Sequence, residues 1–301
     1  MKTLHKISLL TLGIFTLLIN NVFSQDSTVV DTTAVIALPT DGPKRQTFES
    51  GILFDQQTVQ MQPAKSLEFI LIHRFGSIEN GITDLYGIYA AANISFGLNY
   101  NLTDRIMVGF QTVKYNKLQD FQYKVKLVDE TKSGSVPVSI AWFGNVVIDG
   151  RSEETFGTDY KFSSRMSYFN QLLIAKKFTE GFSLQIAPSF THYNMVDTLS
   201  DHDKFALSIL ARYKFTPQFS FVIGYDHPFY IESLSEHLEL DFKSKPNFTV
   251  GFEIATSTHA FHVFLGTANN IVAQEIITRN DKDWKDMQFL VGFNLTRLWN
   301  F

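Results

Sequence analysis

The sequence predicts an all-β protein: an antiparallel up-and-down transmembrane β-barrel of about twelve strands, preceded by an N-terminal region outside the barrel. Three observations predict this fold class. Apolar and polar residues alternate through about twelve segments, the connections alternate between short and long, and the chain ends in an alternating apolar stretch that closes on an aromatic residue.

The alternation has a period of two. In residues 121–127 the odd positions are Phe, Tyr, Val and Leu, and the even positions are Gln and Lys. Successive side chains of a strand point to opposite faces, so one face of this strand is apolar and the other polar. Most segments have about the 9–11 residues that a tilted strand needs to cross a bilayer. The predicted strands are 66–76, 91–101, 104–115, 118–128, 136–148, 165–178, 182–193, 203–215, 218–227, 247–256, 259–267 and 286–298.

The connections between these segments support the same topology. Every second one is short, namely 102–103, 129–135, 179–181, 216–217 and 257–258. The others are mostly long, namely 77–90, 149–164, 194–202, 228–246 and 268–285, with 116–117 as the exception. Outer-membrane barrels have short periplasmic turns and longer external loops, whereas a soluble sandwich has no reason to alternate in this way.

The last residues resemble the assembly signal of outer-membrane barrels. Phe293, Leu295, Trp299 and Phe301 occupy every second position of the alternating terminus, and Arg297 departs from the pattern. A base near the membrane interface can extend its charge towards water. We therefore expect outer-membrane lipid and the barrel assembly machinery to be partners of the chain.

The N-terminal region divides into three parts. Residues 1–24 have the basic start, apolar centre and small-x-small end of a secretory signal peptide, and an uncleaved anchor is the alternative. Residues 25–46 have the composition of a disordered linker. Residues 47–65 precede the barrel, 66–301, and form either a periplasmic arm or a lumen plug.

Composition excludes several classes of function. The formal charge is −4, with 26 Lys and Arg against 30 Asp and Glu, so nucleic-acid binding is not expected. The chain has no Cys, which removes thiolate catalysis and Cys-ligated metals. It also lacks the G-x-S-x-G, Walker A and G-x-G-x-x-G motifs, and we expect neither a reaction nor a cofactor.

No metal site is expected either. His259 and His262 are offset by three, which places their rings on opposite faces of a strand. The acidic and histidine residues of the loop 228–246 suit a solvated loop better than a divalent cation, although their chemistry allows one.

A set of charged residues shares the polar parity of the strands and is predicted to face the lumen. These residues are Glu68, Arg74, Lys124, Lys126, Arg212, Lys214, Glu253 and His262. They form either an ion-paired interior or a polar pathway. Bases outnumber acids among them, which favours anionic solutes. A barrel of this size has a narrow lumen that side chains can partly obstruct.

Several stretches resemble a domain-of-unknown-function family of exported β-barrel proteins of Gram-negative bacteria. The resemblance covers residues 47–301 and implies a barrel in the outer membrane, with no reaction and no active-site motif. The stretches that carry it are His73-Arg74-Phe75-Gly76, Leu85-Tyr86-Gly87, residues 99–109, Pro137-Val138-Ser139, residues 261–269 and residues 293–297.

Four functional hypotheses follow. The first is a non-enzymatic outer-membrane protein that passes or binds a small solute through a narrow polar lumen. The second is an interaction barrel with a sealed lumen, whose external loops or periplasmic arm bind a partner. The third is a membrane lipid hydrolase that pairs His192 with Ser167 or Ser208. The fourth is a soluble lipid-binding barrel with its apolar parity inside.

Overall fold

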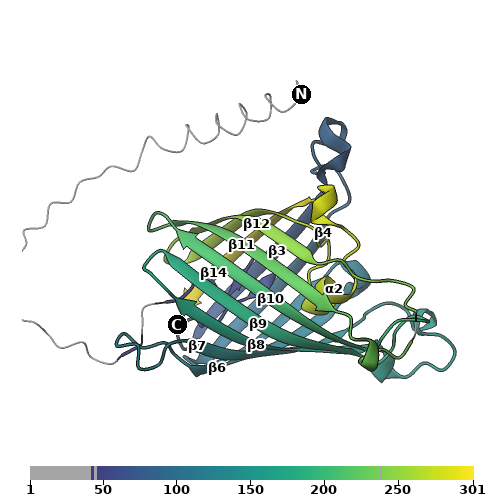
Figure 1. Ribbon diagram of the computed structural model, residues 1–301, viewed down its shortest axis with the longest axis horizontal. Helices are drawn as coiled ribbons and strands as arrows, with labels where there is room; N and C mark the ends of the chain where they lie inside the picture. Colours follow the sequence, from purple (N-terminus) through teal and green to yellow (C-terminus); the bar gives the residue numbers. More distant parts are fainter. Residues whose placement is uncertain (1–41, 44–45, 238) are drawn as a thin grey trace, which may run out of the picture. The chain divides into compact units, whose positions relative to one another are not determined.

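The computed structural model describes residues 42–43, 46–237 and 239–301, and the strands between residues 66 and 300 form one closed barrel of twelve antiparallel strands (Figure 1). The predicted signal peptide, 1–24, and most of the predicted linker lie outside the described residues. The strands are β3 (Ser66–Ser77), β4 (Asn93–Thr103), β5 (Ile106–Val113), β6 (Gln119–Val128), β7 (Ser139–Ile148), β8 (Met166–Lys177), β9 (Phe182–Tyr193), β10 (Asp203–Lys214), β11 (Phe219–Phe229), β12 (Asn247–Ala255), β13 (His259–Gly266) and β14 (Leu290–Asn300).

Each strand pairs with its neighbours in the chain, and the first barrel strand closes the sheet on the last. In the β3–β14 seam Leu71 lies opposite Leu295 and Leu67 lies opposite Trp299. Lipid offers no hydrogen-bond partners, so a sheet is stable in a membrane only when its edges pair with each other. The predicted fold class, an up-and-down barrel of about twelve strands, is confirmed.

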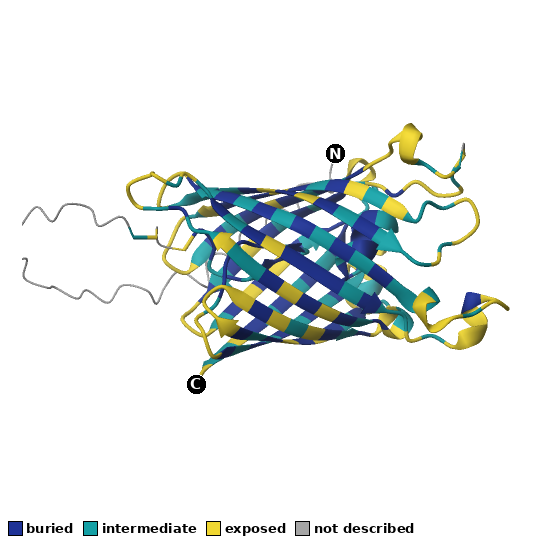
Figure 2. Cartoon of the chain, turned by 90° about the horizontal axis from the view of Figure 1, so that it is seen from below, coloured by how far each residue is buried: buried dark blue, intermediate teal, exposed yellow. Residues whose placement is uncertain are grey.

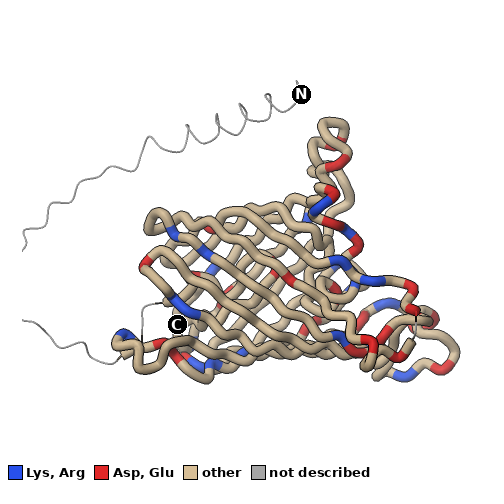
Figure 3. Tube along the Cα trace, in the orientation of Figure 1, with Lys and Arg blue, Asp and Glu red and all other residues tan. Residues whose placement is uncertain are grey.

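The outer face of the barrel is apolar. Burial alternates residue by residue along the strands, which gives the chequered pattern of Figure 2. Large exposed apolar side chains on the strands include Phe96, Leu98, Phe121 and Phe252. Charged residues gather at the two ends of the barrel and are sparse along its wall (Figure 3). The hypothesis of a soluble barrel with its apolar parity inside is therefore wrong, because that parity faces outward.

The long connections lie at the end opposite the C-terminus and carry short helices. No helix in the described part of the chain is both long and apolar enough to cross a membrane. The helical elements are η1 (Ile78–Asp84), η2 (Tyr115–Lys117), η3 (Glu153–Phe156), η4 (Phe162–Arg165), η5 (Glu232–Leu234), α2 (Ala273–Thr278) and η6 (Trp284–Asp286).

The interior is not an open aqueous space, which corrects the expectation of a polar lumen with only partial obstruction. Phe143, Phe169, Leu173 and Leu210 point inward from the wall and join one buried apolar cluster. The chain's own N-terminal residues Phe48, Leu53, Phe54 and Val59 complete this cluster. A segment upstream of the first barrel strand therefore packs inside the barrel.

Candidate functional site: the plugged lumen and its external vestibule

Residues 46–65 form what we call the plug segment, whose central residues are buried within the barrel while Gln46 and residues 63–65 are exposed. Two short strands, β1 (Ile52–Leu53) and β2 (Gln56–Gln57), form a hairpin at its centre. The turn between them places Phe54 at a positive φ of 54°. The Phe54 ring stacks on Phe264 of β13, with centroids 4.3 Å apart and planes at 14°. This apolar contact seats the hairpin tip against the wall.

Buried polar contacts hold the same tip. Asp55 forms an ion pair with Arg74 of β3, and both side chains are almost completely buried. The Asn247 amide donates to the other carboxylate oxygen of Asp55 at 3.0 Å. The Asn294 amide donates to the Phe54 carbonyl at 2.8 Å. The tip therefore contacts strands β3, β12 and β14 at once.

A second set of charged side chains contacts the plug segment at residues 49–51, before the hairpin. The Ser50 hydroxyl donates to Glu253 Oε1 at 2.7 Å, and Arg212 Nε donates to Glu253 Oε2 at 2.7 Å. Glu49 accepts from Lys214 at 2.6 Å and lies 3.6 Å from Arg212. Lys124 donates to the Gly51 carbonyl at 2.9 Å. Buried charges are stable when they are paired and hydrogen-bonded, as these are.

The structure places the predicted lumen residues as follows. Buried within the barrel are Glu68, Arg74, Lys124, Arg212, Glu253 and His262. Lys126 and Lys214 are half-buried near the end of the short turns, where Lys126 pairs with Asp129 at 2.5 Å.

The predicted preference for anionic solutes was based on an excess of bases in the lumen, and acids of the plug segment offset that excess. Arg74 and Lys214 are paired with acids of the plug segment, Asp55 and Glu49 respectively. Parity counting omitted those acids because they belong to no barrel strand.

The residues of the predicted assembly signal lie on the outer face. Phe293, Leu295 and Trp299 are half-buried, and Phe301 is 80% exposed. The Arg297 guanidinium lies 5.0 Å from the centre of the Trp299 ring. Its charge therefore sits beside an aromatic group at the end of the barrel where the chain finishes.

Helix α2 enters the lumen from the opposite end. Gln274 is fully buried and exchanges two amide hydrogen bonds with Asn145 of β7, at 3.3 and 2.7 Å. The α2 residue Thr278 and Tyr193 of β9 share a hydroxyl contact of 3.2 Å. These contacts fix α2 against the wall.

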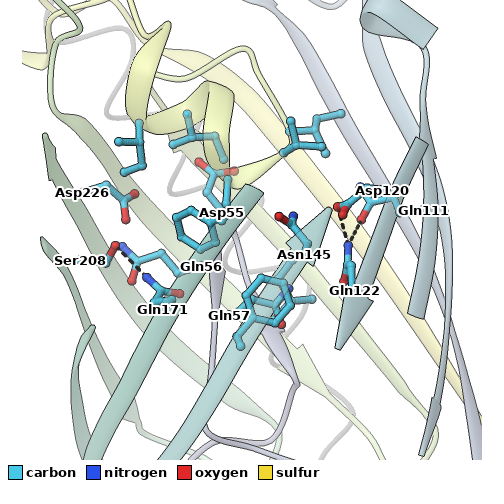
Figure 4. Close-up of a pocket in the computed structure, with 18 of the residues that line it drawn as sticks. Asp55, Gln56, Gln57, Gln111, Asp120, Gln122, Asn145, Gln171, Ser208 and Asp226 are labelled. Atoms are coloured by element: carbon cyan, nitrogen blue, oxygen red, sulfur yellow. Dashed lines mark hydrogen bonds between the residues drawn. The ribbon is translucent and has the colours of Figure 1, made fainter. Parts of the chain in front are cut away.

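Between the hairpin and α2 lies a cavity of about 40 Å³ (Figure 4). Asp55, Asp120 and Asp226 line it together with side-chain amides such as Gln122. A cavity this small holds a few water molecules at most. Asp120 and Asp226 were missed as lumen residues, although Asp120 shares the parity of Lys124 and was identifiable on that ground.

A larger hollow, which we call the vestibule, opens beyond α2 at the end of the long connections. Its volume is about 410 Å³. Tyr115, Tyr193 and Tyr230 line it with Asp197 and Lys204, among other residues. Lys204 Nζ lies 4.1 Å from the centre of the Tyr230 ring and 3.5 Å from an Asp201 oxygen. Loops far apart in the sequence build this hollow, so no local motif could reveal it.

The hydrolase hypothesis is wrong as it was framed. His192 Nδ1 lies 2.6 Å from Asp203 Oδ1. Ser167 and Ser208 are buried on the inner parity of their strands, whereas His192 is half-exposed. Nucleophilic catalysis needs hydrogen-bond reach between base and hydroxyl, which these positions do not give.

In the part of the chain that the structure describes, no group of three or more His, Asp or Glu side chains is arranged to hold a metal ion.

A family model described as a membrane bound beta barrel domain (DUF5777) matches residues 48–299. The chain is similar to an outer membrane channel from Pseudomonas putida F1, with 12% identity, a TM-score of 0.50, and coverage of 80% of this chain and 98% of the other. It is also similar to KdgM porin, with 7% identity, a TM-score of 0.45, and coverage of 78% and 99%. At these identities the likeness shows the barrel fold alone. Comparison with curated proteins finds no match.

Proposed function

We propose that this chain, which belongs to the membrane bound beta barrel family DUF5777, is a non-enzymatic outer-membrane protein that binds a small polar solute and passes it through a lumen gated by the plug segment. The plug segment blocks passage in the state described here. Its withdrawal towards the short-turn end opens the lumen.

One observation carries the proposal: besides the apolar cluster that it shares with the wall, the plug segment meets buried charged groups of the wall. Arg74, Lys124 and Glu253 contact it from three different strands. A permanently sealed core would gain more stability from apolar packing than from buried ion pairs. Charged groups on the inner wall, in contrast, are solvated by water when the plug leaves, so they suit a barrel with both closed and open states.

The outer surface supports placement in an outer membrane. The exposed apolar side chains of the strands match the hydrocarbon layer, and charged residues lie at the two ends (Figure 3). Both ends of the barrel's chain, at Ser66 and Asn300, lie on the side of the short turns, which we assign to the periplasm. Phe293, Leu295, Trp299 and Phe301 remain our candidates for contact with the barrel assembly machinery.

A reversible lock tests the gating. The chain has no Cys, so Gln57→Cys and Gln185→Cys introduce the only thiols, one on the hairpin and one on β9. These positions are adjacent, since the Gln185 amide donates to the Gln57 carbonyl at 2.7 Å. A short, reducible bis-thiol linker tethers the plug segment to the wall. We expect planar bilayers to show no conductance when the linker is intact and channel events after its reduction.

The control is the single variant Gln57→Cys treated with the same reagent, which reacts without tethering and should conduct like the parent protein. A folded barrel that stays silent in every state, including a variant lacking residues 46–62, contradicts the proposal.

The second candidate function is a sealed barrel that binds a partner through an external loop. The observation in its favour is the loop between β3 and β4, which exposes Ile82, Tyr86, Ile88 and Tyr89 at 73%, 46%, 46% and 76%. In Figure 1 this loop stands away from the barrel wall. This candidate would be favoured if neither the double Cys variant after reduction of its linker nor the variant lacking residues 46–62 showed conductance in planar bilayers.

A further inference from the structure

A small cavity beside the vestibule is lined by arginines. Its volume is about 50 Å³, and Arg151, Arg165 and Arg279 contribute to its wall. Arg279 and Tyr193 also line the vestibule, so these two residues stand between the two spaces. The cavity lies between the loop 149–165 and the end of α2, outside the contacts that hold the plug segment.

The positive charge in this cavity exceeds its negative charge. Arg151 is neutralised by Asp149, with Nη2–Oδ2 at 2.6 Å. Arg165 bonds only to neutral acceptors, namely the Tyr160 hydroxyl at 2.6 Å and the carbonyls of Asp149 and Arg151. Among the described residues, Arg279 has no carboxylate within ion-pair distance. Neither guanidinium therefore forms an ion pair among the described residues, although Glu275 and Asp197 lie near enough to Arg279 to act on its charge.

Glu275 is the other acid in the cavity wall, and it offsets little of this charge at mildly acidic pH. Its side chain is buried, and burial raises the pKa of Glu275 to about 7. Asn116 donates to its Oε1 at 3.5 Å, and its Oε2 has no partner.

Aromatic rings fix the planes of the guanidiniums. Arg165 lies 4.8 Å from the centre of the Phe156 ring and 5.0 Å from that of Tyr160, and Arg279 lies 5.8 Å from that of Tyr193. The hydrogen bonds of Arg165 use its Nε and Nη1, so its Nη2 is the group that remains to bind a ligand. The planar fork of a guanidinium matches carboxylate and phosphate oxygens.

We propose that Arg165 and Arg279 form a subsite for the oxyanion, a carboxylate or phosphate, of a small organic solute whose body occupies the vestibule. The inference rests on the proposed function, because it names the class of solute that the barrel receives. Asp197, Asp201 and Asp281 line the vestibule and would repel the anionic group there. They therefore orient the solute with its oxyanion towards the arginines.

Matched probes test this subsite. Glucose, glucuronate and glucose 6-phosphate share one body and differ in the presence and source of the oxyanion. We expect isothermal titration of the detergent-solubilised protein to show both anions binding at least about tenfold more tightly than glucose. Because a bidentate pair with an ionised group is among the strongest hydrogen-bonding arrangements, Arg279→Gln should weaken both anions about tenfold and leave glucose unchanged.

A second substitution at Arg279 separates the effect of guanidinium shape from that of charge, and a substitution elsewhere is the control. Arg279→Lys keeps the charge without the planar fork and should lose part of the affinity. Arg105→Gln, at an exposed ion pair on the opposite end of the barrel, is the control and should bind like the parent protein. Preserved heat-modifiable migration on gels establishes that each variant is folded.

The outcomes are distinct from those of the gating test. Binding is measured with the plug segment locked by the 57–185 linker, so passage is not required. Anion binding that depends on Arg279 in a barrel that never conducts keeps the subsite and removes the channel. Equal binding of glucose, no binding of any probe, or unchanged anion affinity in Arg279→Gln overturns the subsite, whatever the conductance.

Discussion

The plug segment and helix α2 fill the lumen from opposite ends but are attached to the barrel differently. The plug segment continues into a wall strand at one end only, at Ser66. Upstream of it, Pro43 bridges to Thr131 and Gly42 accepts from Lys132, which places that part of the chain against the turn between β6 and β7. Helix α2 is bounded by wall strands on both sides, β13 and β14. The proposed gating therefore requires withdrawal of the plug segment, which is joined covalently to the wall at one end, rather than of α2, which is joined to it at both.

Their chemistry differs in the same sense. Ion pairs and four apolar side chains hold the plug segment, so its release exposes charges that water can solvate. One neutral amide pair, one buried carboxyl and the buried side chains of Ile276 and Ile277 hold α2, and Ile277 joins the same apolar cluster as the plug segment. Charged pairs with the wall therefore distinguish the plug segment from α2, and the proposed gating assigns the movable part to the plug segment.

The largest effect is expected from the ion pair at the hairpin tip. Asp55→Ala leaves the buried Arg74 without a carboxylate, which should destabilise docking of the hairpin by about 3–5 kcal/mol. Hydrogen exchange of residues 52–57 measures this loss. The matched control is Arg105→Ala, whose exposed pair with Asp129 should contribute under about 1 kcal/mol.

The double variant Asp55→Ala/Arg74→Met sharpens this result, because it removes both charges and should recover much of the loss. If Asp55→Ala left the hydrogen-exchange protection of residues 52–57 unchanged, the ion pair would not stabilise the docked hairpin, and the proposed difference between the plug segment and α2 would be contradicted.

An intermediate effect is expected when pH changes the stability with which α2 docks in the lumen. The Glu275 pKa is about 7 when α2 is docked, against 4.5 for the free side chain. The docked state then holds a proton that the undocked state releases, so docking stability falls as pH rises from about 4.5 to about 7. The total loss is on the order of 3 kcal/mol.

The charged and titratable groups that face Glu275 are Arg279, Arg151, Asp149 and Tyr193. Hydrogen exchange of residues 273–278, corrected for intrinsic rates, should show the fall. Glu275→Gln should make the protection independent of pH, and a persisting slope would assign it to another group.

The smallest effect is expected from the amide pair of α2. Gln274→Ala leaves Asn145 with an unsatisfied buried amide and should cost α2 docking about 1–3 kcal/mol. Plug protection should not change, because Asn145 has no hydrogen bond to the plug segment among the described contacts. Loss of protection at residues 52–57 in this variant would show that the two inserts are coupled.

The barrel wall was predictable from the sequence because successive side chains of a strand point alternately to lipid and to the lumen, which gives its hydrophobicity a period of two residues. Several predicted strands begin where the structure begins them, at Ser66, Phe182, Asp203 and His259. The confirmed fold and family depend on this regular part of the chain. Boundaries were less accurate at β14, where the loop residues Phe289 and Gln288 continue the apolar alternation before the strand starts at Leu290.

The lumen was not predictable by the same rule, because the plug segment has no regular period. A signal was nevertheless present. Phe143, Phe169, Leu173 and Val222 occupy the inner parity of β7, β8 and β11, where an aqueous lumen requires polar residues. Such an excess indicates that something apolar packs inside. The vestibule and the arginine cavity gave no signal, since separate loops assemble them.

The seating of the hairpin tip also constrains the order of assembly. The Asn294 bond to the Phe54 carbonyl joins residues 240 positions apart, and the Asn247 bond to Asp55 spans 192. Contacts of such high sequence separation form late and slow folding. Complete seating of the hairpin tip thus requires the final strand, and we expect the bore to be fully blocked only once β14 is in place.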